Sequence, residues 1–520
     1  MNFIDEHKNN VHGILHGFDR LIFRGYLSSF FSEKGMYYYM SQTQVKLTGF
    51  KSFMERQQKK LRQHITQIAQ TEGVQIHYIN NSKESKEDRA KKDFSKDPAK
   101  HGLISIISTQ ESAYTYRLVG NKARKELEVI RQMRPHLHYY LYYNDEEFGW
   151  MHVKIQSWYP FTMQFYVNGK EYLKRCLTKA NIEFNAYDNS ITWVKELEKA
   201  QAFADQLVNK KWDRFFNAFA QRINPFLSQI AQVFQGKGYS WCLHQSEYAT
   251  DVLFKNRNYL ERLYPSILQK ATMFKGGEDI YSFFGRNLTH RSTKQVTGSN
   301  KRFIQGFRVK HYLDKNSVKM YDKSSVLRVE TTINNSRSFK IYKEVERKGK
   351  KTMAWVPMGK AVSNLYRCAQ IAKACNLRYL NSLAQIKLPK NWDKKVEQIS
   401  TNTSQKNRNN NTVRYSAFNL LSKETCLILE AISDGKFDLQ PFSNKMLRQL
   451  LIEKKLFQID LNDSFAIKRL SGKITRLIAK LRAHKMVCKI SNSFKYKLTK
   501  LGRNICYKVL KFKKIELIAN

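Results

Sequence analysis

Two histidines separated by a single residue are the first candidates for chemistry in this chain. His136 and His138 lie in HLHYYLYY (136–143), whose composition predicts a β-strand. Side chains alternate between the two faces of a strand, so both imidazoles would share one face and could bind a divalent metal ion. Tyr172, on a helix expected at about 170–180, would then be available as the nucleophile of a nuclease. The alternative is that this histidine spacing arises by chance.

A second candidate is the segment SVKMYDKSSVLRVETTIN (317–334). It resembles a strand pair of rolling-circle plasmid and phage replication initiators, in which YDK is followed by LRxE. By that resemblance, Asp322 and Glu330 would be metal-binding carboxylates and Arg328 a phosphate contact. The same pattern also fits a turn at Asp322, where aspartate bonds to its own backbone, and a cross-strand ion pair between Arg328 and Glu330.

Other catalytic signatures are missing from the sequence. It contains no Walker A motif, no GxSxG and no GxGxxG. The seven cysteines are dispersed without a CxxC pair, which indicates reduced thiols in a cytoplasmic protein rather than a structural zinc site. We therefore expect no cofactor, apart from a divalent metal ion if the protein is a nuclease.

The charge of the chain identifies the class of partner. Its 520 residues include 91 Lys and Arg against 44 Asp and Glu, a formal net charge of +47. Hydrophobic residues at 42% and aromatic residues at 13% indicate folded domains, so this charge must lie on their surfaces. Such a surface favours a polyanionic partner, and we expect nucleic acid. There is no apolar run long enough for a membrane span and no secretory signal at the N-terminus, so we expect a cytoplasmic protein without a membrane partner.

Helix and strand patterns alternate along the chain and predict an α+β fold in several parts. Residues 1–190 are expected to form a mixed α/β basic domain, 191–300 a helical region, and 301–390 a β-rich segment followed by a helix. A polar stretch at 391–413 has almost nothing apolar to bury, which predicts a flexible linker. Residues 414–520 would form a separate C-terminal domain.

The C-terminal domain has the clearest signature. Helices are expected at 421–432, 443–452 and 466–485, followed by a short hairpin and a last helix, which is the order of a winged helix. The third helix carries one apolar stripe, formed by Leu470, Ile474, Leu477 and Leu481.

This region resembles the recognition helix and wing of MarR-type regulators, which implies contact with duplex DNA. Cationic side chains of the third helix would reach the major groove, and residues of the wing would contact the flanking backbone. The residues so predicted are Lys468, Arg469, Lys473, Arg476, Lys480 and Arg482 on the helix and Lys489, Asn492, Lys495 and Lys497 on the wing. Such contacts position a duplex without specifying its sequence.

The body of the protein also mixes cations with aromatic residues. Arg20 and Arg24, in HGFDRLIFRGYL (16–27), are predicted to reach phosphates, unless Asp19 and Arg20 form a simple structural pair. Basic surfaces lined by aromatic side chains suit single-stranded nucleic acid, because any base can stack on them. Tyrosine-rich strands with one buried face are the structural alternative.

The motifs HGFDRLIFRGYL (16–27), FGWMHVKIQSWYPF (148–161) and VKMYDKSSVLRVETTINN (318–335) resemble those of a family of uncharacterised bacterial proteins with a C-terminal MarR-like winged helix. The resemblance covers nearly the whole chain and implies no particular activity. We interpret the sequence as a nucleic-acid-binding protein whose basic body holds RNA or single-stranded nucleic acid. One form of this interpretation is a ribonucleoprotein, in which the body holds a guide or structured RNA. Its winged helix would contact duplex DNA. Two alternatives stay open: a rolling-circle-type replication initiator or nickase, and a winged-helix transcription regulator.

Overall fold

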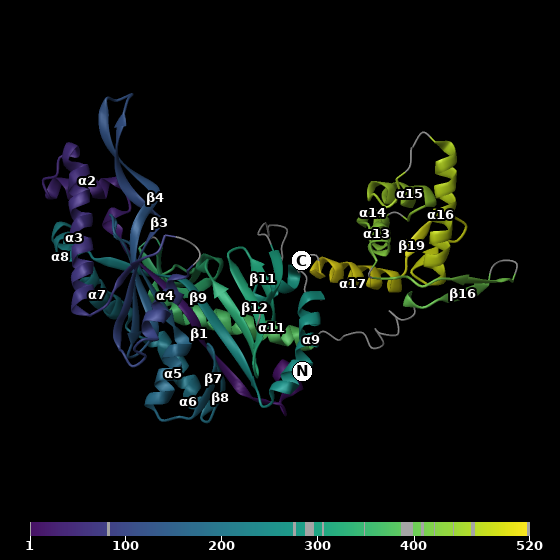
Figure 1. Ribbon diagram of the computed structural model, residues 1–520, viewed down its shortest axis with the longest axis horizontal. Helices are drawn as coiled ribbons and strands as arrows, with labels where there is room; N and C mark the ends of the chain where they lie inside the picture. Colours follow the sequence, from purple (N-terminus) through teal and green to yellow (C-terminus); the bar gives the residue numbers. More distant parts are fainter. Residues whose placement is uncertain are drawn as a thin grey trace. The chain divides into compact units, whose positions relative to one another are not determined.

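A computed structural model describes residues 2–80, 84–273, 277–286, 296–303, 306–347, 349–385, 399–406, 410–420, 422–439, 441–458 and 463–516. It combines helices with one large mixed sheet, which confirms the expected α+β class. The chain divides into two compact units (Figure 1). The first contains Met1–Leu268, Lys275–Ser299 and Phe303–Gln385, and the second contains Gln269–Phe274, Asn300–Arg302 and Ile386–Asn520.

An eleven-stranded sheet forms the core of the first unit, in the order β10-β11-β12-β13-β9-β1-β6-β5-β4-β3-β2. The pairs from β11 to β3 are antiparallel, and β2 lies parallel to β3. The strands are β1 (Val11–Leu27), β2 (Ile76–Tyr78), β3 (Gly102–Asn121), β4 (Glu126–Asp145), β5 (Gly149–Gln156), β6 (Met163–Asn168), β9 (Tyr239–Phe254), β10 (Val296–Phe303), β11 (Gly306–Leu313), β12 (Asn316–Lys323) and β13 (Val326–Ile333).

Helices and two smaller hairpins complete this unit. They are α1 (Phe3–His7), α2 (Glu33–Gln42), α3 (Phe50–Thr71), α4 (Lys86–Phe94), α5 (Gly169–Lys179), α6 (Leu197–Gln206), α7 (Trp212–Ile223), α8 (Leu227–Val233), α9 (Arg257–Met273), α10 (Gly277–Phe283), α11 (Leu365–Gln385), the pair β7 (Phe184–Tyr187) and β8 (Ser190–Val194), and the pair β14 (Lys340–Arg347) and β15 (Lys350–Pro357). Helix α5 lies close to the helix predicted at about 170–180, and α11 is the helix expected after the β-rich segment of residues 301–390.

One face of the sheet is apolar and is packed against helices. Phe216 of α7 lies 4.8 Å from the ring of Phe23 on β1 and 4.6 Å from that of Phe165 on β6. Asn376 of α11 accepts a hydrogen bond from Thr331 on β13 and donates one to the carbonyl of Tyr248 on β9. The side chains that alternate with these therefore belong to the opposite face, which carries the polar residues discussed below.

The expected helical region at 191–300 is wrong in one respect, since it contains β9, a sixteen-residue strand near the middle of the sheet. Strand β9 pairs with β1 on one side and β13 on the other, so all three expected parts of the body belong to one compact unit. Its sequence hides the strand because Glu247 and Asp251 are polar although they are buried. A bulge at His244 also breaks the alternation of apolar side chains.

Strands β3 and β4 form a hairpin of two twenty-residue strands, and β4 extends well beyond the strand predicted at 136–143. Its outer part projects beyond the rest of the sheet (Figure 1). The hairpin is anchored where the hydroxyl of Tyr116 donates to the carbonyl of Ser32 and where Tyr37 of α2 accepts from the amide of Val129.

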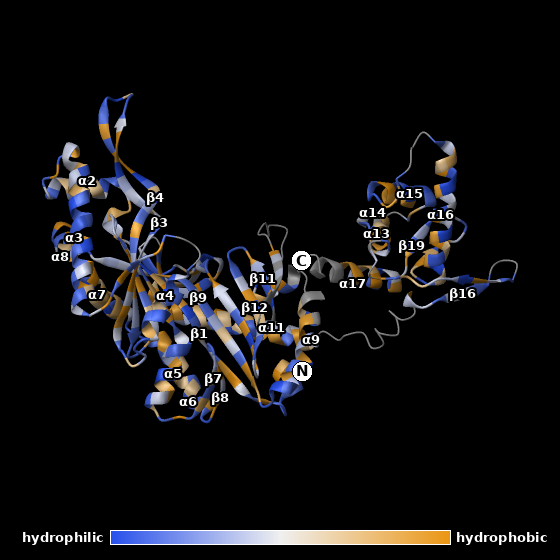
Figure 2. Ribbon diagram, in the orientation of Figure 1, coloured by the Kyte–Doolittle hydropathy of each residue, from blue (hydrophilic) through white to orange (hydrophobic). Residues whose placement is uncertain are grey.

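The second unit follows the expected order of helices and hairpin. Its elements are α13 (Lys423–Ile432), α14 (Gly435–Leu439), α15 (Asn444–Glu453), α16 (Ser464–Ala483), β18 (Val487–Lys489), β19 (Tyr496–Leu498) and α17 (Lys500–Glu516). Leu470, Ile474 and Leu481 of α16 are buried as predicted, and Leu477 is partly buried. Figure 2 shows hydrophilic and hydrophobic residues alternating along this helix.

Part of the predicted linker is structured. Residues 391–398 and 407–409 lie outside the described residues, but β16 (Thr403–Lys406) and β17 (Thr412–Tyr415) pair as an antiparallel hairpin. Ile399 is fully buried in the core of the second unit. The linker prediction is therefore wrong for these residues, because a polar hairpin satisfies its backbone hydrogen bonds without an apolar face.

None of the described helices is both long enough and apolar enough to cross a membrane.

Candidate nucleic-acid interface and buried polar cluster

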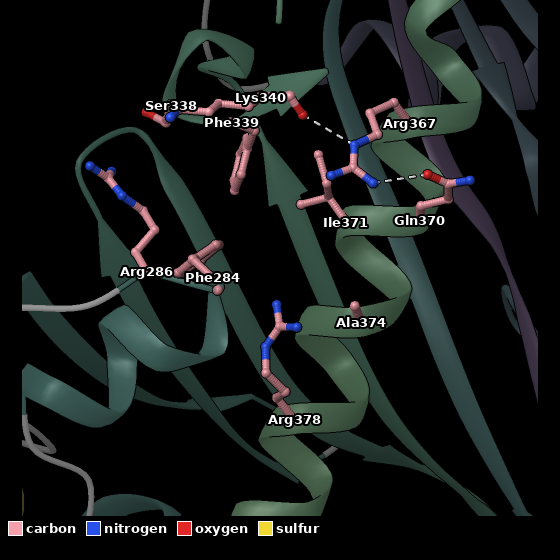
Figure 3. A pocket seen from close by; sticks show the side chains of 11 residues that line it. Phe284, Arg286, Ser338, Phe339, Lys340, Arg367, Gln370, Ile371, Ala374 and Arg378 are labelled. Atoms are coloured by element: carbon pink, nitrogen blue, oxygen red, sulfur yellow. Dashed lines mark hydrogen bonds between the residues drawn. The ribbon is translucent and has the colours of Figure 1, made fainter. Parts of the chain in front are cut away.

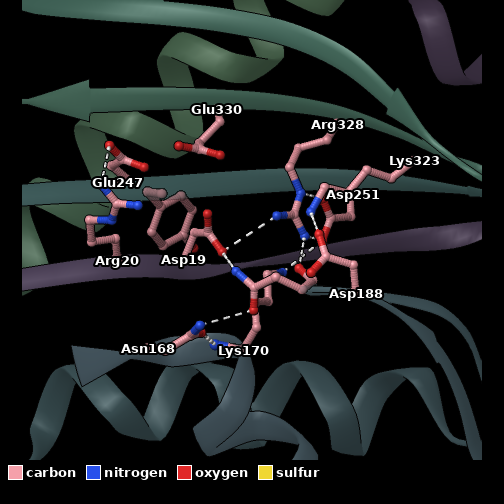
Figure 4. A network of polar contacts seen from close by, with 12 residues as sticks. Asp19, Arg20, Asn168, Lys170, Asp188, Glu247, Asp251, Lys323, Arg328 and Glu330 are labelled. Carbon is pink, nitrogen blue, oxygen red and sulfur yellow. Dashed lines mark hydrogen bonds and ion pairs between the residues drawn. The ribbon is translucent and has the colours of Figure 1, made fainter. Parts of the chain in front are cut away.

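A buried network of charges lies on the polar face of the sheet, beneath the start of α5 (Figure 4). Arg328 on β13 donates from Nε to Asp251 Oδ1 at 2.6 Å and from Nη2 to Asp251 Oδ2 at 2.9 Å. Lys170 of α5 donates to the same carboxylate at 2.7 Å. Burial opposes the charge of Asp251, but Arg328 and Lys170 outweigh it and hold the pKa of that carboxyl at about 2.

Arg328 therefore does not have the role predicted for it. Its side chain is 0% exposed. Its remaining donors bind the carbonyl of Asn189 at 2.8 Å and the carboxylate of Asp19 at 3.4 Å. The predicted phosphate contact is wrong, because every side of this guanidinium faces protein and no phosphate of a nucleic acid can reach it.

Three carboxylates meet beside this network. Asp19, Glu247 and Glu330 have oxygens within 4.8 Å of one another. Asp19 is the extra residue of a β-bulge in β1, since Phe18 pairs with Tyr248 and Arg20 pairs with Glu247. Lys319 of β12 lies among them, with Nζ 2.6 Å from Glu330 and 3.3 Å from Glu247.

The electrostatics of this acidic cluster are mixed. Burial raises the pKa of Asp19 and of Glu330. Burial also acts to raise the pKa of Glu247, but bonds from the neighbours of Glu247 outweigh it and lower that pKa. Three carboxylate oxygens could hold an oxygen-preferring divalent cation. Lys319 already neutralises two of them, however, so a cation could enter only if that ammonium moved.

The catalytic set predicted from sequence is not assembled. In the described part of the chain, Asp19, Glu247 and Glu330 are the one group of metal-ligating side chains that converges, and neither histidine belongs to it. His138 donates from Nδ1 to the carbonyl oxygen of His136 at 2.9 Å, and burial lowers its pKa to about 4. His136 instead stacks on Trp158, with ring centroids 5.6 Å apart.

Tyr172 and Asp322 are also misplaced for the predicted chemistry. Tyr172 is 1% exposed and stacks on Phe148. Burial raises its pKa, so it is unsuited to attack a phosphodiester. Asp322 pairs with Leu327, whereas Lys319 pairs with Glu330. Asp322 and Glu330 therefore lie on opposite faces of the sheet and cannot share a metal ion.

An open cleft of about 370 Å³ lies on the polar face near the base of the β3–β4 hairpin. It is formed by β1, β3, β4, β5, β6 and the loop that precedes β6, and none of the described residues that line it is acidic. Its lining includes the cations Arg24, Arg131 and Lys154, the aromatic side chains Tyr26 and Tyr114, and also His138, Met133, Gln156 and Gln164.

Some side chains of this cleft are accessible, whereas His138 and Gln156 are buried and Lys154 is paired with Glu111. Arg24 donates to Gln164 at 3.2 Å, and Arg131 lies over the ring of Tyr114 at 4.8 Å. Tyr114 is 50% exposed and Met133 is 54% exposed. Arg20, the other cation predicted on β1, has an exposed side chain, as expected for a surface cation. Its ion pair is with Glu247, at 4.0 Å, and not the predicted pair with Asp19.

The hairpin continues the basic surface of the cleft. Between Ser112 and Pro135 it carries six cations and two acids. The exposed cations there are Arg117, Lys122, Arg124, Lys125 and Arg134. A two-stranded ribbon of this kind is narrow enough to enter a groove of a duplex or to lie along a strand.

The predicted basic surface of the second unit is present with one exception. The exposed residues on α16 and around the β18–β19 hairpin are Lys468, Arg469, Lys473, Arg476, Arg482, Lys489, Asn492, Lys495 and Lys497. Lys480 is the exception, because its ammonium donates to the carbonyl of Ala417 at 3.0 Å and lies 4.2 Å from the ring centre of Phe418. Phe494, which the sequence analysis did not select, is 86% exposed at the hairpin turn.

Comparison of the chain with protein-family models, with curated proteins and with solved structures finds no match. The functional argument therefore depends on the geometry described above.

Proposed function

We propose that this protein is a cytoplasmic nucleic-acid-binding protein. The cleft and the β3–β4 hairpin would hold single-stranded RNA or DNA, and the exposed basic residues of α16 and the β18–β19 hairpin would contact duplex DNA in the manner of a winged helix. The observation that carries the proposal is the cleft, whose described lining combines Tyr26 and Tyr114 with Arg24, Arg131 and Lys154 and contains no carboxylate, although Lys154 is paired with Glu111. Cations neutralise phosphates, and tyrosine faces stack on bases of any sequence.

Binding to single strands tests the cleft directly. Fluorescence anisotropy with labelled 20-nucleotide RNA and DNA would compare the full chain with Tyr114→Ala and Arg24→Gln. Because stacking of a base on an aromatic side chain is worth roughly 1–3 kcal/mol, Tyr114→Ala should weaken binding by about 5- to 100-fold. Arg257→Gln, which removes an exposed cation of α9 outside the cleft, is the matched control and should change affinity little. Equal affinities for all variants would overturn the assignment of the cleft.

A ribonucleoprotein is the specific form of this proposal, and purification from the native host tests it. A discrete RNA that remains bound after a high-salt wash would support it. If no RNA co-purifies, the guide or structured RNA is excluded and only general single-strand binding is left.

The two alternatives predict different results. A transcription regulator would lose all binding through substitutions on α16 and none through those in the cleft. A nickase would form a covalent adduct with single-stranded origin DNA and a divalent metal ion. The burial of Tyr172 and the separation of Asp322 from Glu330 weigh against the nickase.

A further inference from the structure

A second concave site, separate from the cleft, lies between the loop after α10, the 3-10 turn at Ser336–Ser338 and helix α11 (Figure 3). Its volume is about 500 Å³, which is the size of a small-ligand pocket. Four of the residues that line it are cationic, and none of its described lining is acidic. The cations are Arg286, Lys340, Arg367 and Arg378.

The arginines retain unused donors. Arg378 directs Nε and Nη2 to the carbonyl of Phe283, at 2.9 and 2.6 Å. Arg367 directs Nε to the carbonyl of Lys340 at 3.1 Å and Nη1 to Gln370 at 3.0 Å. Each guanidinium has five N–H groups, so these bonds orient the two side chains and leave donors for a ligand. The Nη1 of Arg286 is buried without a hydrogen-bond partner.

Unpaired cations at one concave site need an anion. Phosphate is the anion that several guanidinium groups bind best, since each offers parallel N–H donors to its oxygens. Phe284, Phe339 and Ile371 form the apolar part of the pocket lining.

An exposed aromatic pair lies next to this pocket. Tyr342 and Trp355 face each other across β14 and β15 with ring centroids 5.4 Å apart, and they are 50% and 54% exposed. Arg367 connects the two features, because its guanidinium lies 5.3 Å from the centre of the Trp355 ring while it lines the pocket. A base can therefore stack on this pair while its phosphate lies in the pocket.

We propose that this pocket binds the phosphomonoester at the end of a nucleic-acid strand, with the terminal base on Tyr342 and Trp355. The inference rests on the proposed nucleic-acid-binding function and adds a recognised end to it. A terminal phosphate carries a charge of about −1.5 to −2 at neutral pH, against −1 for a phosphate inside the chain. Four cations in one pocket match the more highly charged terminal phosphate. An internal phosphate would instead need a groove that is open on both sides, because the nucleic-acid chain continues from it in both directions.

Competition between strand ends tests the proposal. Anisotropy would compare one 20-nucleotide RNA with a 5′-phosphate, a 3′-phosphate or hydroxyls at both ends, and adenosine monophosphate would serve as the free-nucleotide competitor. The full chain should bind one phosphorylated form about tenfold or more tightly than the hydroxyl form, as expected for charge-assisted hydrogen bonds. Arg286→Gln and Arg367→Gln should abolish that preference while leaving binding of the hydroxyl RNA unchanged.

Arg337→Gln is the matched control, because Arg337 is exposed beside the pocket but does not line it. It should keep the preference for the phosphorylated end. Equal binding of all three RNAs would overturn the pocket's role and leave the proposed function intact. If adenosine monophosphate competes with an affinity equal to that of the RNA, the ligand of the pocket is a free nucleotide and not a strand end. That result would also overturn the proposal. Failure to bind any RNA or DNA would refute the proposed function itself.

Discussion

Replacement of Asp251 by asparagine should destabilise the first unit strongly. Asp251→Asn keeps the shape of the side chain but removes the one charge that both Arg328 and Lys170 contact. All three side chains are at most 1% exposed, so water cannot compensate for the loss. Two buried cations would then share Asp19 as their nearest acid, and breaking a buried pair in this way costs about 3–5 kcal/mol.

The same residue predicts a pH dependence. The pKa of Asp251 is about 2 in the folded protein against an ordinary value of 3.8. Because the folded-state pKa is the lower one, this stabilisation is present above pH 3.8 and is lost as the pH falls through 2. It amounts to about 2.5 kcal/mol at neutral pH. The difference in stability between the wild type and Asp251→Asn should therefore shrink by about 1.8 kcal/mol between pH 4 and pH 2.

Urea denaturation of the full chain measures both effects, with emission from the buried Trp212 and Trp241 reporting on the first unit. Glu261→Gln is the matched control, because it also converts a carboxylate to an amide but in an exposed ion pair with Arg257. That variant should lose less than about 0.5 kcal/mol. If Asp251→Asn unfolds at the same urea concentration as this control, the buried network does not stabilise the fold and the reasoning is refuted.

Two further variants test the packing under α5 and the basic surface of α16. Gly169→Ala would place a methyl group 2.3 Å from the carbonyl oxygen of Phe18. We therefore expect the free energy of unfolding to fall by about 1–3 kcal/mol, seen as a lower melting temperature. An unchanged melting temperature would show that the backbone there can move. Arg476→Gln should reduce the slope of log affinity against log salt for duplex DNA by about one, equally for unrelated sequences. Lys436→Gln on α14 is its control, and an equal reduction in both variants would mean that α16 has no special role.

Elements with a clear local pattern could be predicted from the sequence. The strands β5 and β6 alternate apolar and polar residues, and α16 repeats Leu470, Ile474 and Leu481 at helical spacing. The capping signals were equally local, as at Ser422 and Ser443, whose side chains accept from the first turns of α13 and α15. These features depend on residues within a few positions of one another.

The buried acidic cluster could not be predicted in the same way. Asp19, Glu247 and Glu330 come from three strands far apart in the sequence, and only the register of β1 with β9 and of β9 with β13 brings them together. A further obstacle is the bulge at Asp19, which turns that side chain toward its partners and has no mark in the local pattern. The resemblance to replication initiators pairs Glu330 with Asp322, but the register of β12 with β13 places these two side chains on opposite faces of the sheet.

The buried cluster also explains how the protein keeps its strong outward charge. Asp19, Glu247, Asp251 and Glu330 are four carboxylates, and they lie against the cations Lys170, Lys319 and Arg328 and the nearby Arg20. Four negative and four positive charges cancel within the sheet, so this group leaves the net charge of +47 to the remaining residues, most of them at the surface. Lys154 of the cleft pairs with Glu111 and Arg124 of the hairpin pairs with Glu128. The other cations of the cleft, the β3–β4 hairpin and α16 are therefore the ones that could bind a phosphate backbone.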